Sequence, residues 1–242
     1  MPRDRIHWIG AFLMCATLVA AAPAFAQEFY FNDFDGGETF GTGVAGALTG
    51  ETAVEPGQGF VGLGPAGGEF ADNLLRNLSA LQPGAPTVLT LSGLPPHEAI
   101  RLEFLFAAID SWDGIFAVDA EDLFVVTLDG ETIFQESFLN STAPATQSYA
   151  GPALSFQQNL GFGAASADFL DSAYDLAENF VSLPHTADTL TLEFFTDGAH
   201  WQGGADESWG MDNLIVSVPE PALFAQLLVG GAVLGLCRRR RV

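Results

Sequence analysis

The chain has 242 residues, of which 30 are acidic and eight are basic, and its formal net charge at pH 7 is −22. Residues 27–218 hold 28 of the acids but only two basic residues, Arg76 and Arg101, which gives this segment a net charge of −26. Such a balance excludes nucleic acid and anionic membrane surfaces as partners, because both require positive charge on the protein. Divalent cations, neutral sugars and cationic surfaces remain compatible partners, and keeping the protein soluble is the alternative role for the charge.

The chain begins with the pattern of a secretory signal peptide. Two arginines among the first five residues form a basic start, the apolar run 9–22 follows, and Ala24-Phe25-Ala26 places small residues around a cleavage point. This order predicts that residues 1–26 are removed before Gln27 and that the protein is exported. A retained first transmembrane helix is the alternative.

Alternation of apolar and polar residues dominates the segment between the two ends. In chain order it predicts strands at Glu28–Phe31, Thr87–Ser92, Ile100–Phe106, Leu123–Leu128, Thr132–Phe138, Asn179–Leu183, Thr189–Thr196 and Asn213–Val218. Asp129-Gly130, between the fourth and fifth of these, favours a tight type I′ hairpin turn. Only Asp72–Leu81 and Phe169–Leu176 have the pattern of short helices, and the glycine-rich stretch 36–68 is long enough to contain one or two more short strands.

These elements predict one all-β domain over residues 27–217. Many short strands without long helical periods favour an antiparallel β-sandwich, jelly-roll-like in arrangement. Both cysteines, Cys15 and Cys237, lie outside this domain, so it contains no disulfide and no thiol chemistry.

Two acidic stretches adjoin predicted strand ends, and each contains an acid-Ser-Trp unit. They read AIDSWDGIFAVDAEDLFVV and DESWGMDN. Oxygen-rich clusters without cysteine are typical of calcium, which takes about six to eight oxygen ligands. An EF-hand does not fit, because Trp112 and Ile115 stand where that loop needs a carboxylate and a glycine. We therefore expect a calcium site assembled from separate loops, with the ligands Asp110, Asp113, Asp122, Glu207 and Asp212. The pair Asp33 and Asp35 is a second candidate, and solvated turns are the alternative.

The three tryptophans of the domain are Trp112, Trp201 and Trp209, and all lie in predicted loops beside acids and glycines. Exposed aromatic faces pack on sugar rings while neighbouring carboxylates accept hydrogen bonds from sugar hydroxyls, so these residues are predicted carbohydrate contacts. The alternative is that each ring caps one end of the sandwich core.

The C-terminus has three parts in a fixed order. Val218, Pro219, Glu220 and Pro221 come first, and their prolines end the last strand. Residues 222–237 are apolar and predict a transmembrane helix with a rise of about 24 Å. Arg238, Arg239, Arg240 and Arg241 follow and are expected to stay in the cytoplasm. Together, residues 218–242 resemble a PEP-CTERM sorting signal.

That resemblance implies a delivery route. It implies a Gram-negative bacterium, export, transient anchoring in the inner membrane through the tail, and an exosortase-type enzyme as processing partner. The final location would be the cell envelope, the cell surface or the extracellular matrix, in association with polysaccharide and biofilm.

The pattern IDSWDG, DLFVVTLDG, HTADTLTLEF and DESWGMDNLIV, within Ala99–Val218, resembles jelly-roll modules of the carbohydrate-binding type in exported bacterial proteins. The sequence contains no zinc-type histidine spacing and no Gly-x-Ser-x-Gly elbow, and we assign no catalytic residue. The predicted function is therefore non-catalytic binding of polysaccharide by calcium-stabilised loops. A structural matrix or surface protein without a specific ligand is the first alternative, and a glycoside hydrolase or lyase is the second.

Overall fold

The computed structural model describes residues 27–50, 52–117, 120–140, 144–163, 169–199 and 201–219. All of them belong to one compact unit, Ala26–Glu220. The predicted signal peptide, the predicted helix 222–237 and the arginine cluster lie outside the described residues. Within the described ranges, no helix has the length and apolar character needed to cross a membrane.

The described chain consists mainly of strands, with two short 3-10 helices, η1 (Gln58–Phe60) and η2 (Ala177–Phe180). The strands are β1 (Glu28–Asn32), β2 (Thr39–Phe40), β3 (Ala45–Thr49), β4 (Thr52–Pro56), β5 (Asn73–Asn77), β6 (Thr87–Ser92), β7 (Ala99–Asp110), β8 (Ile115–Ala117), β9 (Ala120–Glu121), β10 (Leu123–Leu128), β11 (Glu131–Ser137), β12 (Ala153–Gln158), β13 (Asp171–Asp175), β14 (Leu183–Pro184), β15 (Thr189–Asp197) and β16 (Glu207–Ser217).

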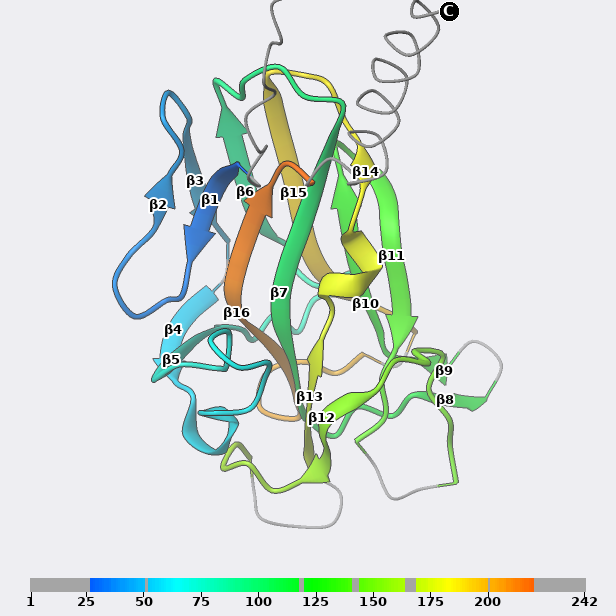
Figure 1. Cartoon of the computed structure of the whole chain (residues 1–242). Coiled ribbons are helices and arrows are strands. Elements are labelled where there is room, and N and C mark those ends of the chain that lie inside the picture. Colours follow the sequence, from blue (N-terminus) through cyan, green and yellow to red (C-terminus); the bar gives the residue numbers. More distant parts are fainter. Residues whose placement is uncertain are drawn as a thin grey trace, which may run out of the picture. The chain divides into compact units, whose positions relative to one another are not determined.

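Two large sheets face one another and form a sandwich (Figure 1). The nine-stranded sheet has the order β12-β13-β7-β16-β1-β2, with β14 beside β7, β5 beside β16 and β4 beside β5. The five-stranded sheet has the order β11-β10-β15-β6-β3, and β8 pairs with β9 separately. All of these pairings are antiparallel. The predicted antiparallel all-β sandwich is confirmed, and its jelly-roll-like character stays a prediction.

The predicted hairpin at Asp129-Gly130 is confirmed. These two residues join β10 to β11 and have φ values of 51° and 84°, the left-handed conformations of a type I′ turn. The five-stranded sheet also contains β15, whose residues Leu190, Leu192 and Phe194 all point into the core. Alternating burial along β15 made this strand readable from sequence.

Apolar residues cover both faces of the nine-stranded sheet. The main core lies between the two sheets and is rich in aromatic rings. A second cluster packs on the opposite face of the nine-stranded sheet; its buried members are Phe60, Phe70, Leu74, Leu105, Ala107, Ile109, Phe162 and Ala173. Strand β7 is covered on both faces over part of its length. Its first half alternates between buried and half-buried residues, while its second half is buried at every position.

Several local predictions are wrong. Asp72–Leu81 contains strand β5 instead of a helix, and Phe169–Leu176 contains strand β13. Asn179–Leu183 is not a continuous strand, because it spans the end of η2 and the first residue of β14. The stretch 36–68 contains three short strands, β2, β3 and β4, where one or two were expected.

Candidate functional site

Three carboxylates from separate segments converge where β7 ends and β16 begins. Asp113 lies in the turn after β7, Asp122 lies between β9 and β10, and Glu207 is the first residue of β16. One oxygen of each lies within 4.8 Å of the others. Asp122 and Glu207 are fully buried, and Asp113 is half-buried. We call these three residues the acidic centre; they are three of the five predicted calcium ligands.

Backbone hydrogen bonds hold the acidic centre in place. The Asp113 amide donates to Asp122 Oδ2 at 2.6 Å, and the Gln202 amide donates to Glu207 Oε2 at 2.7 Å. The other oxygens of the two buried carboxyl groups, Asp122 Oδ1 and Glu207 Oε1, are buried without any hydrogen-bond partner. A buried oxygen without a partner is costly when the group is charged, so each of these oxygens needs a proton, a cation or a bound water.

Burial raises the pKa of both groups. Desolvation, followed by the charge of Asp122, raises the pKa of Glu207 to about 8. Desolvation likewise raises the pKa of Asp122 to about 7, opposed by the hydrogen bond from the Asp113 amide. Because these folded-state pKa values exceed the ordinary values of 4.5 for glutamate and 3.8 for aspartate, the folded protein binds more protons than the unfolded chain between about pH 4 and pH 8. Without a metal, stability therefore falls as the pH rises through this range.

The chemistry of the acidic centre fits a hard cation such as calcium. All three side chains offer oxygen, and calcium accepts carboxylates together with carbonyl oxygens and water in flexible geometry. A bound cation would stabilise the ionised forms of Asp122 and Glu207 and satisfy their unpartnered oxygens. It would also hold together the turn after β7, the start of β10 and the loop that leads into β16.

Asp110 does not join the acidic centre, which corrects the prediction for this residue. Its backbone is left-handed, with φ of 67°, and its Oδ2 lies 3.4 Å from the Arg76 guanidinium. Its amide donates to Asp171 Oδ1 at 3.1 Å. Desolvation, together with the charge of Asp171, raises the pKa of Asp110 to about 6. Both carboxyl groups are fully buried, so this polar cluster on Arg76 is part of the folded interior.

Asp212 also lies elsewhere. It follows Glu207 by five residues in β16, and residues an odd number apart on a strand point to opposite faces. Asp212 Oδ2 accepts a hydrogen bond from the Ala71 amide at 2.7 Å, and burial raises its pKa to about 7. The second predicted pair is engaged in a loop: Asp35 accepts from the Asp72 amide at 3.0 Å, and Asp33 accepts from the Asp35 amide at 3.1 Å.

The structure corrects the prediction that the tryptophans contact carbohydrate. Trp112, Trp201 and Trp209 are 0%, 3% and 1% exposed, so none presents a ring face to solvent. The indole of Trp112 donates to the Ser208 carbonyl at 2.7 Å, and that of Trp201 donates to the Ser79 carbonyl at 2.9 Å. Internal acceptors for the indole N–H groups allow the rings to be buried beside polar loops. All three rings instead pack within the main core.

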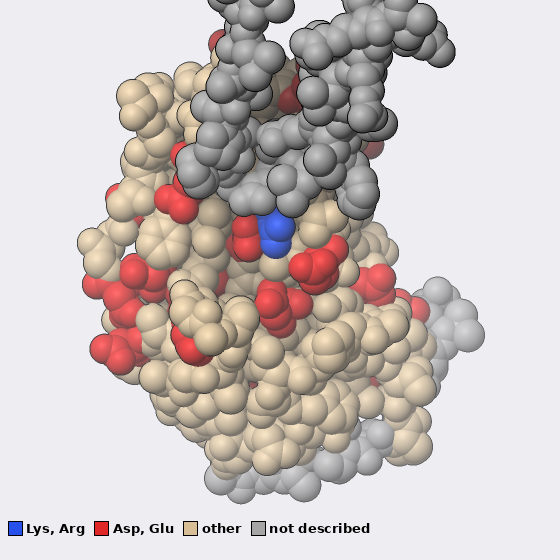
Figure 2. Space-filling view, viewed as in Figure 1, with Lys and Arg blue, Asp and Glu red and all other residues tan. Residues whose placement is uncertain are grey.

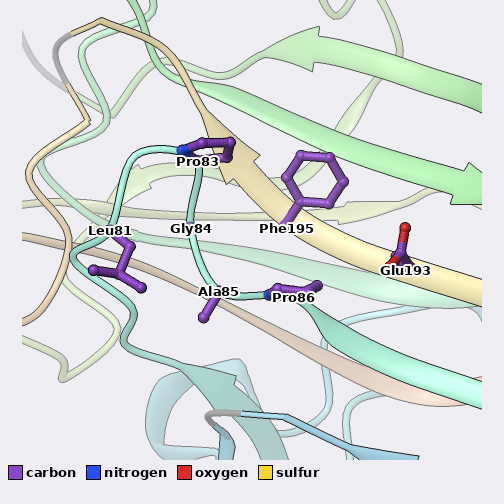
Figure 3. Close-up of a pocket in the computed structure, with 7 residues that line it drawn as sticks. All are labelled: Leu81, Pro83, Gly84, Ala85, Pro86, Glu193 and Phe195. Atoms are coloured by element: carbon purple, nitrogen blue, oxygen red, sulfur yellow. The ribbon is translucent and has the colours of Figure 1, made fainter. Parts of the chain in front are cut away.

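A groove on the outer face of the five-stranded sheet was missed from sequence. It has a volume of about 450 Å³ and is lined by Leu81, Pro83, Gly84, Ala85, Pro86, Glu193 and Phe195 (Figure 3). Its signal was readable, because the alternation that directs Leu190, Leu192 and Phe194 inward directs Glu193 and Phe195 outward. Phe195 is a half-buried aromatic ring on this face.

Comparisons with known proteins assign no family. No family model and no curated protein matches the chain. Three solved structures show weak similarity, each over 70–84% of this chain. A Paenibacillus cycloisomaltooligosaccharide glucanotransferase has 14% identity and a TM-score of 0.33, and a Clostridium thermocellum xylanase fragment with CBM22-1 and GH10 modules has 9% identity and a TM-score of 0.34. The CBM22-1 xylan-binding domain from Paenibacillus barcinonensis has 14% identity and a TM-score of 0.32. The chain spans 17% and 28% of the first two chains and 100% of the third, and at these scores the similarity does not assign a function.

Proposed function

We propose that residues 27–217 form an exported, non-catalytic module that binds polysaccharide, and that calcium held by the acidic centre stabilises its loops. The observation that carries the calcium part is the pair of fully buried carboxyl groups, Asp122 and Glu207, each with one unpartnered oxygen beside Asp113. Calcium would connect segments that are distant in sequence. One of them, the loop before Glu207, follows directly on β15, the strand that lines the groove.

The outer face of the five-stranded sheet supports the polysaccharide part. The groove there combines an aromatic ring, Phe195, with a carboxylate, Glu193, and apolar walls with a few placed polar groups are typical of small-molecule sites. Its volume of about 450 Å³ falls within the range of such sites, roughly 300–1,000 Å³. On the opposite face of the sandwich, which Figure 2 draws, acidic side chains also dominate the charged surface. This charge disfavours anionic polymers as ligands.

Calcium titration and polysaccharide binding test the proposal together. Chelated protein is expected to bind calcium in calorimetry and to unfold at a higher temperature in calcium than in chelator, while magnesium has a smaller effect because it demands near-octahedral geometry. Pull-down on a panel of insoluble polysaccharides is expected to recover the protein more efficiently with calcium. A flat calorimetric trace with unchanged melting would overturn the calcium part. Binding to no glycan would leave a structural matrix protein as the better description.

We propose delivery by the C-terminal signal. Strand β16 ends at Ser217, and the Val218 amide donates to the Gln27 carbonyl at 2.9 Å, so the sandwich ends where the sorting motif begins. An exosortase-type enzyme would then act on a chain anchored in the inner membrane and release it to the envelope, surface or matrix. Mass spectrometry of the mature protein is expected to show an N-terminus at Gln27 and a C-terminus without Arg238–Arg241; an intact C-terminus would argue against processing.

A further inference from the structure

We infer that the groove beside Phe195 binds an amino-sugar residue of a polysaccharide, with the sugar ring on Phe195 and its ammonium group at Glu193. This inference rests on the proposed polysaccharide binding and names the class of sugar. The proposed site lies on the outer face of the five-stranded sheet, away from the main core.

The groove is built by two segments that lie directly against one another. The Gly84 amide donates to the Thr196 carbonyl at 2.7 Å. A Cβ at position 84 would lie 2.5 Å from Thr196 Oγ1, so a larger residue there would force Thr196 to shift. Segment 81–86 therefore forms a wall beside Phe195, with Leu81 60% exposed at its rim (Figure 3).

Carboxylates flank the aromatic ring. Glu193, Phe195 and Asp197 alternate along β15 and so share its outer face, with Cα atoms about 6.6–6.8 Å apart. Glu193 Oε2 accepts a hydrogen bond from the Thr127 hydroxyl at 3.0 Å, which fixes the carboxylate beside the groove. A sugar ring on Phe195 would therefore have a carboxylate within reach on either side.

The negative charge of the five-stranded sheet favours a positively charged ligand. The five strands β3, β6, β10, β11 and β15 contain four acidic residues (Glu131, Glu136, Glu193 and Asp197) and no lysine, arginine or histidine. Both arginines of the domain lie on strands of the other sheet, Arg76 on β5 and Arg101 on β7. An amino sugar meets attraction without any competing positive charge, whereas a uronic acid or sulfated sugar would be repelled.

A basic peptide would carry the same positive charge as an amino sugar, but the backbone of β15 is less suited to binding a peptide. Extended peptides are commonly bound by adding a strand to a free sheet edge. Strand β15 has no free edge, since it pairs with β10 on one side and β6 on the other. The groove offers a ring face and carboxylates in place of backbone donors, which suits a sugar.

Binding of three oligosaccharides of equal length tests the inference: a glucosamine hexamer, its N-acetylated form and cellohexaose. At pH 6 and low salt, the glucosamine hexamer is expected to bind about tenfold more tightly than the other two, because only its amino groups are charged. The variant Glu193→Gln is expected to remove that preference, and Phe195→Ala is expected to weaken binding of all three. The variant Glu131→Gln removes an equal charge from an exposed residue of the same sheet and is expected to keep the preference.

The outcomes separate this inference from the proposed function. Equal binding of cellohexaose and the glucosamine hexamer, lost in Phe195→Ala, would overturn the amino-sugar assignment and leave polysaccharide binding intact. Preference for the glucosamine hexamer that persists in both groove variants would place the site elsewhere and overturn the inference. Tighter binding of hexalysine than of the glucosamine hexamer would assign the groove to a basic protein segment. Binding of no oligosaccharide and no polysaccharide would overturn the proposed function itself.

Discussion

Replacing Glu207 by glutamine is expected to stabilise the calcium-free protein at pH 8 and to abolish its stabilisation by calcium. The glutamine carbonyl can accept the Gln202 amide as the carboxylate does, and its amide group occupies the position of the unpartnered oxygen. The variant thus removes a buried charge without removing the one hydrogen bond that the side chain makes. Because burial raises the pKa of Glu207 to about 8, the gain in unfolding free energy is on the order of 4 kcal/mol at pH 8 and shrinks toward pH 5.

Urea denaturation at several pH values, with calcium and with chelator, measures both effects. Wild-type protein in chelator is expected to lose stability from pH 5 to pH 8, with a shallower loss in the variant. Asp122→Asn is expected to behave similarly, since its amide can also occupy the place of an unpartnered oxygen. Exposed Glu131 provides the control: Glu131→Gln should leave the response to calcium unchanged. A Glu207→Gln protein that still gains stability from calcium would show that the metal binds elsewhere.

Replacing Trp209 by alanine is expected to lower the unfolding free energy by about 3–5 kcal/mol, the range for large aromatic residues in a core. The ring is 1% exposed and packs 5.1 Å from the ring of Phe124, across the two sheets. Its loss opens a cavity in the main core between the two sheets that close-packed neighbours fill only in part.

Phe156 is the matched control for this substitution. It is 45% exposed, so Phe156→Ala is expected to change the unfolding free energy by no more than about 0.5 kcal/mol. Thermal and urea unfolding of both variants measure the difference. A Trp209→Ala protein that keeps wild-type stability and loses only glycan binding would contradict the buried position and restore the sugar-contact prediction.

Sequence periodicity was clearest where burial along a strand alternates from one residue to the next. In β15 and in the first half of β7, buried residues alternate with half-buried or exposed ones, so period two is visible. In β5 the adjacent residues Leu74 and Leu75 are both buried, one in each apolar cluster. Their pattern carries no alternation, which is why β5 was predicted as a helix. The second cluster, on the outer face of the nine-stranded sheet, depends on long-range packing that local periodicity does not report.

The acidic centre was predictable in part, because its residues lie next to strand ends. Chain neighbours of strand ends gather at the ends of a sandwich, so the expectation that Asp113, Asp122 and Glu207 meet is consistent with the structure. Predicting where Asp212 lies would have required knowing which face of β16 its side chain points to. Predicting where Asp110 lies would have required knowing that its backbone is left-handed. The tryptophans were misplaced because flanking acids and glycines suggested exposed loops, whereas Trp209 lies within β16.

Strand β16 is the final strand of the domain and occupies a central place in the nine-stranded sheet. It pairs with β7 along one side and with β1 and β5 along the other. A ribosome or a translocation channel delivers the chain from its N-terminus, so until Ser217 emerges the neighbours of β16 have exposed edges and Trp209 is missing from the core. The order of delivery therefore makes folding a late, all-or-none event: the sandwich closes only when nearly the whole domain is available, and a chain truncated before β16 is expected to remain open to proteases and to aggregation.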